Sequence, residues 1–205
     1  MSATRLFLIR HGEVESRYQG AFGGRIDMDL SPQGHRQAEA TARYLQPLHF
    51  NAIYCSPMKR ARQTLAPLLC NGHAEAVILP DFGEVHFGDW TGLTWQEVFE
   101  KYQIHATQWL DFIEQAKVPN GECSRLFRSR IEPGLRKILQ DHPNQSVAIV
   151  CHGGVIRMML SILLKLPLPQ MASFEVEYAS ITEVHCTPQR TVVERLNFTP
   201  WRDLP

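Results

Sequence analysis

The sequence predicts one α/β domain, a three-layer sandwich in which helices cover both faces of a largely parallel central sheet. Short apolar runs typical of buried strands alternate along the chain with segments of helical pattern. The chain has 205 residues and no internal repeat or low-complexity tract. At roughly 100–200 residues per domain, we expect residues 1–205 to form a single domain. Apolar residues make up 44% of the chain and charged residues 20%, as in ordinary globular proteins.

The N-terminal part of the chain begins with a predicted strand and a predicted helix. Leu6–Ile9 is a short apolar run and predicts a buried strand that is followed by Arg10. A long loop with several glycines comes next. Ser31 then matches a helix N-cap and Pro32 a first helical residue, so we expect a helix from there to about Leu45.

The same succession of strand and helix then repeats. Ala52–Cys55 predicts a second strand. Ser56 and Pro57 repeat the pairing of a capping residue with proline, which predicts a helix to about Leu69. Val77–Leu79 predicts a third strand.

The middle of the chain is predicted to be helical. Thr94 and Glu97 match a capping box, in which each side chain accepts a hydrogen bond from the backbone of the other residue, so a helix is expected to begin there. Apolar residues at helical spacing predict two further helices, over Tyr102–Gln115 and Leu126–Gln140.

The C-terminal part returns to strands. Val147–Val150 predicts a fourth buried strand, and Val155–Leu166 predicts the helix that follows it. Alternation of apolar and polar residues in the tail predicts three more strands, at Glu175–Tyr178, Thr182–His185 and Thr191–Arg195.

The charge balance excludes one broad class of partner. The 21 lysines and arginines equal the 21 aspartates and glutamates. No net positive field therefore attracts nucleic acid or an anionic membrane surface, and we expect neither as a partner. Any anion that this protein handles must be bound by a local cluster of cations.

The cysteines and apolar segments point to a cytoplasmic protein without a metal. The five cysteines are scattered and form no CxxC pair, which argues against a disulfide scaffold and a zinc site. The apolar run near the N-terminus is too short for a signal peptide. The apolar residues 147–168 are interrupted by His152, Arg157 and Lys165, which argues against a membrane span.

Charged and nucleophilic side chains follow the predicted strands. Arg10 and His11 come directly after the first strand, Arg60 and Glu84 follow the second and third, and His152 follows the fourth. In open α/β sheets, ligands bind beyond the carboxyl ends of the strands, so these side chains are expected to converge. Arginine suits phosphate geometry, and a histidine among arginines stays neutral and nucleophilic.

Four blocks, in order along the chain, resemble the histidine phosphatase superfamily, which includes phosphoglycerate mutases, fructose-2,6-bisphosphatases and α-ribazole phosphatases. The blocks are Leu8–Glu13, Ser56–Thr64, Glu84–Gly92 and Cys151–Arg157, and a shorter element is Gly121–Cys123. One short motif can arise by chance, but four in order are a specific signal. The segments Arg-His-Gly-Glu-Val and Phe-Gly-Asp-Trp favour the α-ribazole phosphatase-like proteins of the phosphatase branch.

The resemblance implies a role for each matching residue. His11 would accept the phosphoryl group, while Arg10, Arg60 and His152 would surround the phosphoryl oxygens. Glu84 would protonate the leaving alkoxide and then activate water, so it must be protonated when substrate binds. The glycines expected to bind substrate or phosphate are Gly12, Gly24 and Gly153. Neither a metal nor a cofactor is expected, because the cations already stabilise the transferring group.

Some positions depart from the family pattern or stay open. Arg17 stands where the family usually has Asn, so we expect it to bind an anionic part of the substrate outside the phosphate that is cleaved. The alternative is that Arg17 points into solvent or forms an ion pair with Glu13 or Glu15. His86 lies two residues after Glu84 and could face either the site or solvent.

These residues predict a metal-independent phosphomonoesterase that hydrolyses a small phosphorylated metabolite through a phosphohistidine intermediate. Two alternatives are a phosphoglycerate mutase-type phosphoryl transfer and a non-catalytic binder of phosphorylated ligands. A mutase must exclude water, and the 28 residues between Gly92 and Gly121 look short for the family's mutases, so hydrolysis is favoured. A binder is expected to lose His11 or Glu84, and both are present. The sequence leaves the substrate, the pathway and the oligomeric state open.

Overall fold

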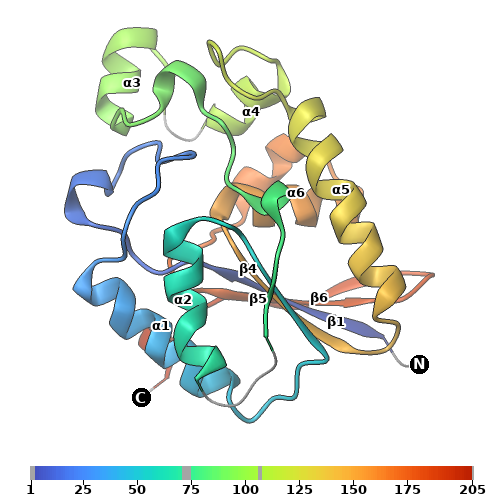
Figure 1. Ribbon diagram of the computed structural model, residues 1–205. Coiled ribbons are helices and arrows are strands. Elements are labelled where there is room, and N and C mark those ends of the chain that lie inside the picture. Colours follow the sequence, from blue (N-terminus) through green and yellow to red (C-terminus); the bar gives the residue numbers. More distant parts are fainter. Residues whose placement is uncertain (1–2, 71–74, 106–107, 205) are drawn as a thin grey trace.

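A computed structural model describes residues 3–70, 75–105 and 108–204 (Figure 1). Within these ranges the centre of the fold is a six-stranded sheet with the strand order β3-β2-β4-β1-β5-β6. The strands are β1 (Thr4–Arg10), β2 (Ala52–Cys55), β3 (Val77–Ile78), β4 (Ser146–Cys151), β5 (Ile181–Cys186) and β6 (Thr191–Phe198).

The pairing of the strands is mostly parallel and decides where the loops meet. The pairs β1–β4, β2–β4 and β2–β3 are parallel, whereas β1–β5 and β5–β6 are antiparallel. In the register of β1 with β4, Arg10 lies opposite Cys151. The residues that follow these two strands, His11 and His152, are therefore brought side by side at the carboxyl edge of the sheet.

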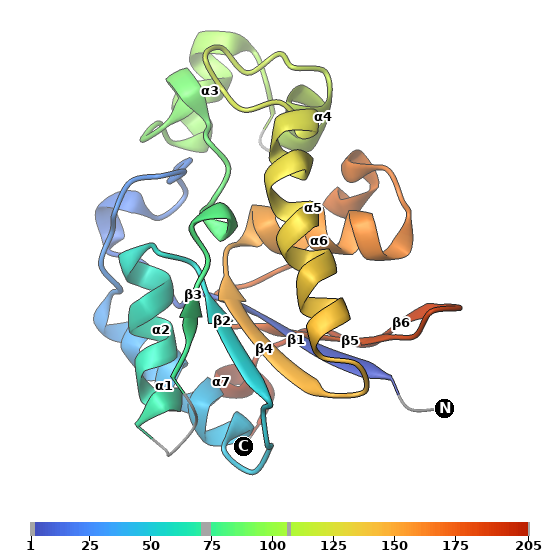
Figure 2. The same cartoon turned by 45° about the vertical axis from the view of Figure 1, so that its right-hand side comes forward.

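Helices cover both faces of this sheet. In Figure 2, α1 (Pro32–Leu45) and α2 (Lys59–Leu69) lie on one side of the sheet, and α5 (Ser124–Asp141) and α6 (Gly153–Leu164) lie on the other. The short helices α3 (Trp95–Tyr102) and α4 (Trp109–Glu114) lie beyond the carboxyl ends of β1 and β4, and α7 (Pro200–Asp203) contacts α1. The predicted three-layer α/β domain with a largely parallel sheet is confirmed.

The side chains of β1 point alternately to the two faces of the sheet, and this explains why both faces need helices. Leu6 and Leu8 belong to the large apolar cluster formed with α5 and α6. Phe7 and Ile9 point the other way and belong to the cluster formed with α1 and α2. All four side chains are at most 2% exposed. A strand that is apolar on both faces is stable only when both faces are covered.

Two predicted helix starts are confirmed in detail. The Ser31 side chain accepts a hydrogen bond from the Gly34 backbone, and Pro32 is the first residue of α1. The Thr94 side chain and the Glu97 carboxylate form a reciprocal capping box at the start of α3. In both places the local signal and the tertiary structure agree, because the side-chain oxygens meet backbone N–H groups that the helix leaves unpaired.

Two predicted helices are wrong in part. Ser56 caps no helix, because its hydroxyl contacts His152 instead, and α2 begins at Lys59. The helix expected over Tyr102–Gln115 is interrupted, since α3 ends at Tyr102, its C-cap Gln103 adopts the left-handed region (φ 56°), and α4 begins only at Trp109. Residues 106–107 lie outside the described part of the chain.

The strand expected at Glu175–Tyr178 is absent from the structure. The Glu177 backbone N–H donates to the Asn197 side chain, and the Val176 carbonyl accepts from the Arg10 side chain. The backbone of this segment is thus bonded to side chains and not to a neighbouring strand. The segment forms one side of the pocket described next.

Candidate active site

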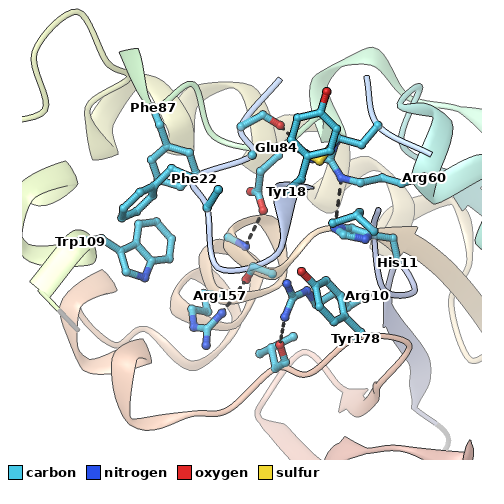
Figure 3. A pocket seen from close by; sticks show the side chains of 18 of the residues that line it. Arg10, His11, Tyr18, Phe22, Arg60, Glu84, Phe87, Trp109, Arg157 and Tyr178 are labelled. Atoms are coloured by element: carbon cyan, nitrogen blue, oxygen red, sulfur yellow. Dashed lines mark hydrogen bonds between the residues drawn. The ribbon is translucent and has the colours of Figure 1, made fainter. Parts of the chain in front are cut away.

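A pocket of about 360 Å³ opens beyond the carboxyl ends of β1 and β4 (Figure 3). The loop after β1, the N-termini of α2 and α6, and residues 172–178 all contribute to it. Residues from these separate segments meet here because their strands end at the same edge of the sheet. The charged and histidine side chains that line it are Arg10, His11, Arg60, Glu84, Arg157 and Glu175.

His11 presents its Nε2 atom to the pocket. Its Nδ1 lies 2.8 Å from the Gly12 carbonyl, which only accepts hydrogen bonds, so Nδ1 carries the proton. Arg60 Nε donates to Nε2 at 3.1 Å, which shows that Nε2 holds the lone pair. The Gly12 backbone N–H is in turn held by the Thr64 hydroxyl at 2.9 Å. The imidazole is thus oriented with its nucleophilic nitrogen toward the arginines.

His152 lies beside His11 and is fully buried, with ring centroids 5.2 Å apart. The Ser56 hydroxyl accepts from the Met58 backbone at 3.3 Å and lies 2.6 Å from His152 Nε2. Among the described residues this nitrogen is the one acceptor within reach of the hydroxyl proton, so Ser56 donates to it. The proton of His152 is then on Nδ1, which is buried and has no hydrogen-bond partner in the described residues. This N–H is a free donor for an anion.

Arg10 and Arg60 are fixed by backbone carbonyls and not by carboxylates. Arg60 is 2% exposed and donates to the Ile26 and Gly24 carbonyls at 2.7 and 2.8 Å. Arg10 donates to the Val176 carbonyl at 2.6 Å, and its guanidinium lies 4.0 Å from the centre of the Tyr178 ring. Both cations therefore keep their full charge for a ligand in the pocket.

Burial and positive neighbours keep both histidines neutral. Burial holds the pKa of His11 well below its ordinary value of 6.5, and the Arg60 and Arg10 charges lower it further. The same causes, burial first, hold the pKa of His152 well below 6.5. Burial also lowers the pKa of Arg60 to about 10, which leaves it charged at neutral pH. A neutral imidazole beside charged guanidiniums is both nucleophilic and adjacent to an anion site.

The Glu84 carboxyl group is fixed by two backbone N–H groups. It accepts from Val85 N at 2.9 Å and from Gly154 N, in the first turn of α6, at 3.1 Å. A β-carbon at Gly154 would lie 2.5 Å from Glu84 Oε1. Only glycine at this position lets the carboxyl group approach the helix so closely.

A buried ion pair holds the loop that carries Glu84. Arg130 of α5 pairs with Glu122 at 2.7 Å and donates to the Gly83 carbonyl at 2.7 Å and the Glu84 carbonyl at 3.2 Å. The Glu122 backbone also donates to the His86 carbonyl at 2.8 Å. The Gly121–Cys123 element of the sequence therefore helps to position Glu84, although the element itself does not reach the pocket.

Aromatic side chains form the outer part of the pocket. Phe22 packs against Phe87 and Trp95 at ring-centroid distances of 4.9 and 4.5 Å, and Phe87 packs against Trp109 at 5.4 Å. In Figure 3, Phe22, Phe87 and Trp109 lie together on the side of the pocket away from His11. This part of the pocket suits an apolar portion of a ligand.

Most residues expected at the site are brought together. His11, Arg10, Arg60 and Glu84 line the pocket with Gly24 and Gly153, while His152 and Gly12 lie directly behind them. Gly24 acts through its carbonyl, which fixes Arg60. Across the described part of the chain, no group of three or more metal-ligating side chains is arranged to hold a metal ion. No helix of that part is long and apolar enough to cross a membrane.

Arg17 is not placed as expected. Its side chain is 68% exposed, pairs with Glu15 at 3.1 Å and does not line the pocket. The surface ion pair, which was the alternative, is what the structure shows. An acidic neighbour two residues away satisfies the guanidinium locally. His86 and Arg62 are likewise exposed and outside the pocket.

Several functional side chains escaped the sequence analysis. The local sequence predicts a helix cap at Ser56 and a strand that ends at Tyr178. Thr64 has no predicted role of its own within its matching block. Arg157 closes the last matching block, four residues after Gly153, and this spacing on a helix is the signal that places the two residues on the same face.

A sequence model of the histidine phosphatase superfamily (branch 1) matches residues 6–199. The chain belongs to this superfamily. It is 31% identical over 195 residues to phosphoserine phosphatase 1 of Hydrogenobacter thermophilus, covering 95% of this chain and 92% of that protein. It is 32% identical over 178 residues to the adenosylcobalamin/alpha-ribazole phosphatase of Salmonella typhimurium, covering 84% and 86%.

A solved structure with the same fold is the alpha-ribazole phosphatase from Shigella flexneri. It superposes with a TM-score of 0.81 at 27% sequence identity, covering 94% of this chain and 96% of that one. The resemblance seen in the sequence is confirmed: the chain is a histidine phosphatase, a phosphoric monoester hydrolase with likeness to the α-ribazole phosphatases.

The two buried histidines predict that acid destabilises the phosphatase. Above pH 6.5 they are neutral in both the folded and the unfolded chain; below it, only the unfolded chain binds their protons. The free energy of unfolding should therefore fall as the pH drops from about 6.5 toward the lower folded pKa values, by up to about 1.4 kcal/mol per pH unit for each histidine. Urea unfolding at several pH values measures this slope. His11→Gln should make it shallower, and an unchanged slope would contradict the assignment.

Proposed function

We propose that this phosphatase hydrolyses a small phosphomonoester without a metal, through a phosphohistidine intermediate on Nε2 of His11. One observation carries the proposal: a neutral imidazole presents its lone pair at 3.1 Å from the Arg60 guanidinium in the pocket. The Arg60 N–H that now contacts Nε2 is available to a phosphoryl oxygen once substrate enters. The same contact thus marks where the nucleophile and the anion meet.

In the first step, His11 Nε2 attacks phosphorus. The N–P bond forms, the bond from phosphorus to the leaving oxygen breaks, and protonated Glu84 gives its proton to that oxygen. Arg10, Arg60 and the free Nδ1–H of His152 neutralise the charge on the phosphoryl oxygens. These donors are already oriented by carbonyls and by Ser56, so little reorganisation is needed when the charge develops.

In the second step, water replaces the alcohol. Glu84, now a carboxylate, removes a proton from the water as its oxygen attacks phosphorus. The N–P bond breaks, its electrons return to His11 Nε2, and inorganic phosphate forms. The neutral imidazole and protonated Glu84 are restored. Glu84 serves both steps from one position, beside the N-terminus of α6.

Metal independence and hydrolysis are tested together with p-nitrophenyl phosphate as the probe. Activity should be unchanged by EDTA, because Arg10, Arg60 and His152 supply the charge stabilisation, and vanadate should inhibit by occupying the same cations. Alcohol and inorganic phosphate should appear in equal amounts. Loss of turnover in EDTA that Mg²⁺ or Zn²⁺ restores would overturn the metal-independent mechanism. Phosphoryl transfer to 3-phosphoglycerate in preference to water would instead indicate a mutase.

A further inference from the structure

Arg157 is a cation of the pocket that the mechanism above does not use. It lies in α6, one turn after Gly153, and lines the pocket. A β-carbon at Gly153 would lie 3.3 Å from Arg157 Nη1 and 3.5 Å from Arg10 Nε, so both guanidinium groups pack closely against this glycine. In Figure 3, Arg157 lies between Arg10 and Trp109, on the far side of Arg10 from His11.

Among the residues that the structure describes, no carboxylate forms an ion pair with this guanidinium. Arg157 donates to the Gly153 carbonyl at 3.3 Å and to the Phe174 carbonyl at 3.0 Å, and its Nε is buried without a partner among the described residues. By contrast, Arg130 of the neighbouring helix pairs with Glu122 at 2.7 Å. A half-buried cation held by carbonyls alone keeps its charge available to an incoming anion.

Burial and a neighbouring positive charge make this arrangement of Arg157 energetically costly. Burial, followed by the repulsion of Arg10, lowers the pKa of Arg157 to about 10. The attraction of Glu84 and Glu175 opposes this shift, but neither carboxylate forms an ion pair with Arg157. Binding an anion would relieve the repulsion between the two arginines.

The transferred phosphoryl group is not the anion that Arg157 is placed to bind. Arg60 contacts the nucleophilic Nε2 directly, and Arg10 is the residue next to His11. Arg157 lies beyond Arg10, toward the aromatic side of the pocket, where the alcohol portion of the substrate must extend. Its Nη1 and Nη2 nitrogens each keep one N–H beyond the carbonyl bonds, which matches the two oxygens of a carboxylate.

We propose that Arg157 binds a carboxylate on the leaving group, so that this phosphatase prefers phosphomonoesters of hydroxy acids over those of neutral alcohols. The proposal rests on the proposed function, because it places the leaving group of that reaction. It assigns to Arg157 the role for which Arg17 was considered from the sequence. Arg157 is a specificity-determining residue that sets which phosphomonoester binds, and His11 acts on the phosphoryl group alike in every case.

The test compares 3-phosphoglycerate with glycerol 3-phosphate, which differ by a carboxylate in place of a hydroxymethyl group. Wild-type kcat/KM should be higher for 3-phosphoglycerate, and Arg157→Gln should reduce the ratio of the two values by about tenfold or more, the scale of one charge-assisted contact. Arg157→Lys, which keeps the charge, should reduce the ratio less. Arg17→Gln removes an exposed arginine outside the pocket and should leave the ratio unchanged.

The outcomes separate this inference from the function on which it rests. If the wild type hydrolyses p-nitrophenyl phosphate but shows no preference for the carboxylated substrate, the inference fails and the proposed function stands. Equal losses for both substrates in Arg157→Gln and Arg157→Lys would make Arg157 a structural residue. If the wild type releases no phosphate from p-nitrophenyl phosphate, the proposed function fails.

Discussion

Replacement of His11 by glutamine should lower kcat/KM by about 10⁴-fold or more, because the variant has no nucleophilic nitrogen to accept the phosphoryl group. Glutamine fills most of the space of the buried imidazole, and its amide oxygen can accept the Arg60 Nε–H in place of Nε2, so the fold should be kept. Steady-state assays with p-nitrophenyl phosphate measure the loss, and thermal unfolding confirms that the variant is folded.

The matched control is His86→Gln. His86 is exposed and lies outside the pocket, although it is only two residues from Glu84 along the chain. Its activity should equal that of the wild type. A folded His11→Gln enzyme that keeps a tenth of the wild-type rate would assign the nucleophile to another residue.

Replacement of Glu84 by glutamine should have the second largest effect, and the effect should depend on the leaving group. General acid catalysis contributes about 10²–10⁴-fold, and a poor leaving group such as an alkoxide needs it most. Phosphorylation of His11 by glycerol 3-phosphate should therefore slow by about that factor, whereas the same step with p-nitrophenyl phosphate should slow much less. Rapid-quench measurement of the first turnover separates this step from the later attack by water.

Gly154→Ala provides a second approach to the same carboxyl group. The added methyl group would lie 2.5 Å from Glu84 Oε1 and 3.4 Å from Trp109, so the flexible carboxyl group must move. Glu84 is kept but displaced in this variant. We therefore expect a larger loss of rate with the alkyl substrate than with the aryl substrate, as in Glu84→Gln, but a smaller difference between the two. Equal losses for the alkyl and aryl substrates in both variants would remove Glu84 from the acid role.

The parallel part of the sheet and its two layers of helices were largely predictable because its central strands are continuous apolar runs. Leu6–Ile9 and Val147–Val150 are apolar on both faces, and a chain can bury both faces only between two layers of helices. The N-cap at Ser31 was predictable for a similar reason, since its signal is complete within four residues of sequence.

The set of candidate catalytic residues could be assembled from sequence because each member follows a strand, and parallel strands end at one edge of the sheet. The residues that orient this set could not be predicted from sequence, because their contacts depend on packing between distant segments. Ser56 and His152 are 96 residues apart, and their 2.6 Å contact replaces the cap that the local sequence predicts. The segment at Glu175–Tyr178 has the alternation of a strand, yet tertiary bonds to Arg10 and Asn197 occupy its backbone.

Arg17 and Arg157 also show that distance along the chain does not determine which side chains reach the pocket. Arg17 lies six residues after His11, but the chain turns away and Glu15 pairs with it on the surface. Arg157 is far from His11 in sequence, but the pairing of β1 with β4 and its place one turn into α6 bring it to the pocket. Proximity along the chain favoured Arg17, whereas the topology of the sheet favours Arg157.

The proposed mechanism depends on a covalent bond between phosphorus and Nε2 of His11, and this intermediate can be trapped. Wild-type enzyme mixed with p-nitrophenyl phosphate and quenched in alkali within milliseconds should carry one phosphoryl group, because phosphohistidine is labile in acid and stable in base. Digestion and mass spectrometry should place it on the peptide that contains His11, and the phosphorus NMR signal should be that of the Nε2 isomer. A phosphoryl group on another residue, or turnover that gives inorganic phosphate with no trapped intermediate in wild type and in Glu84→Gln, would contradict the account.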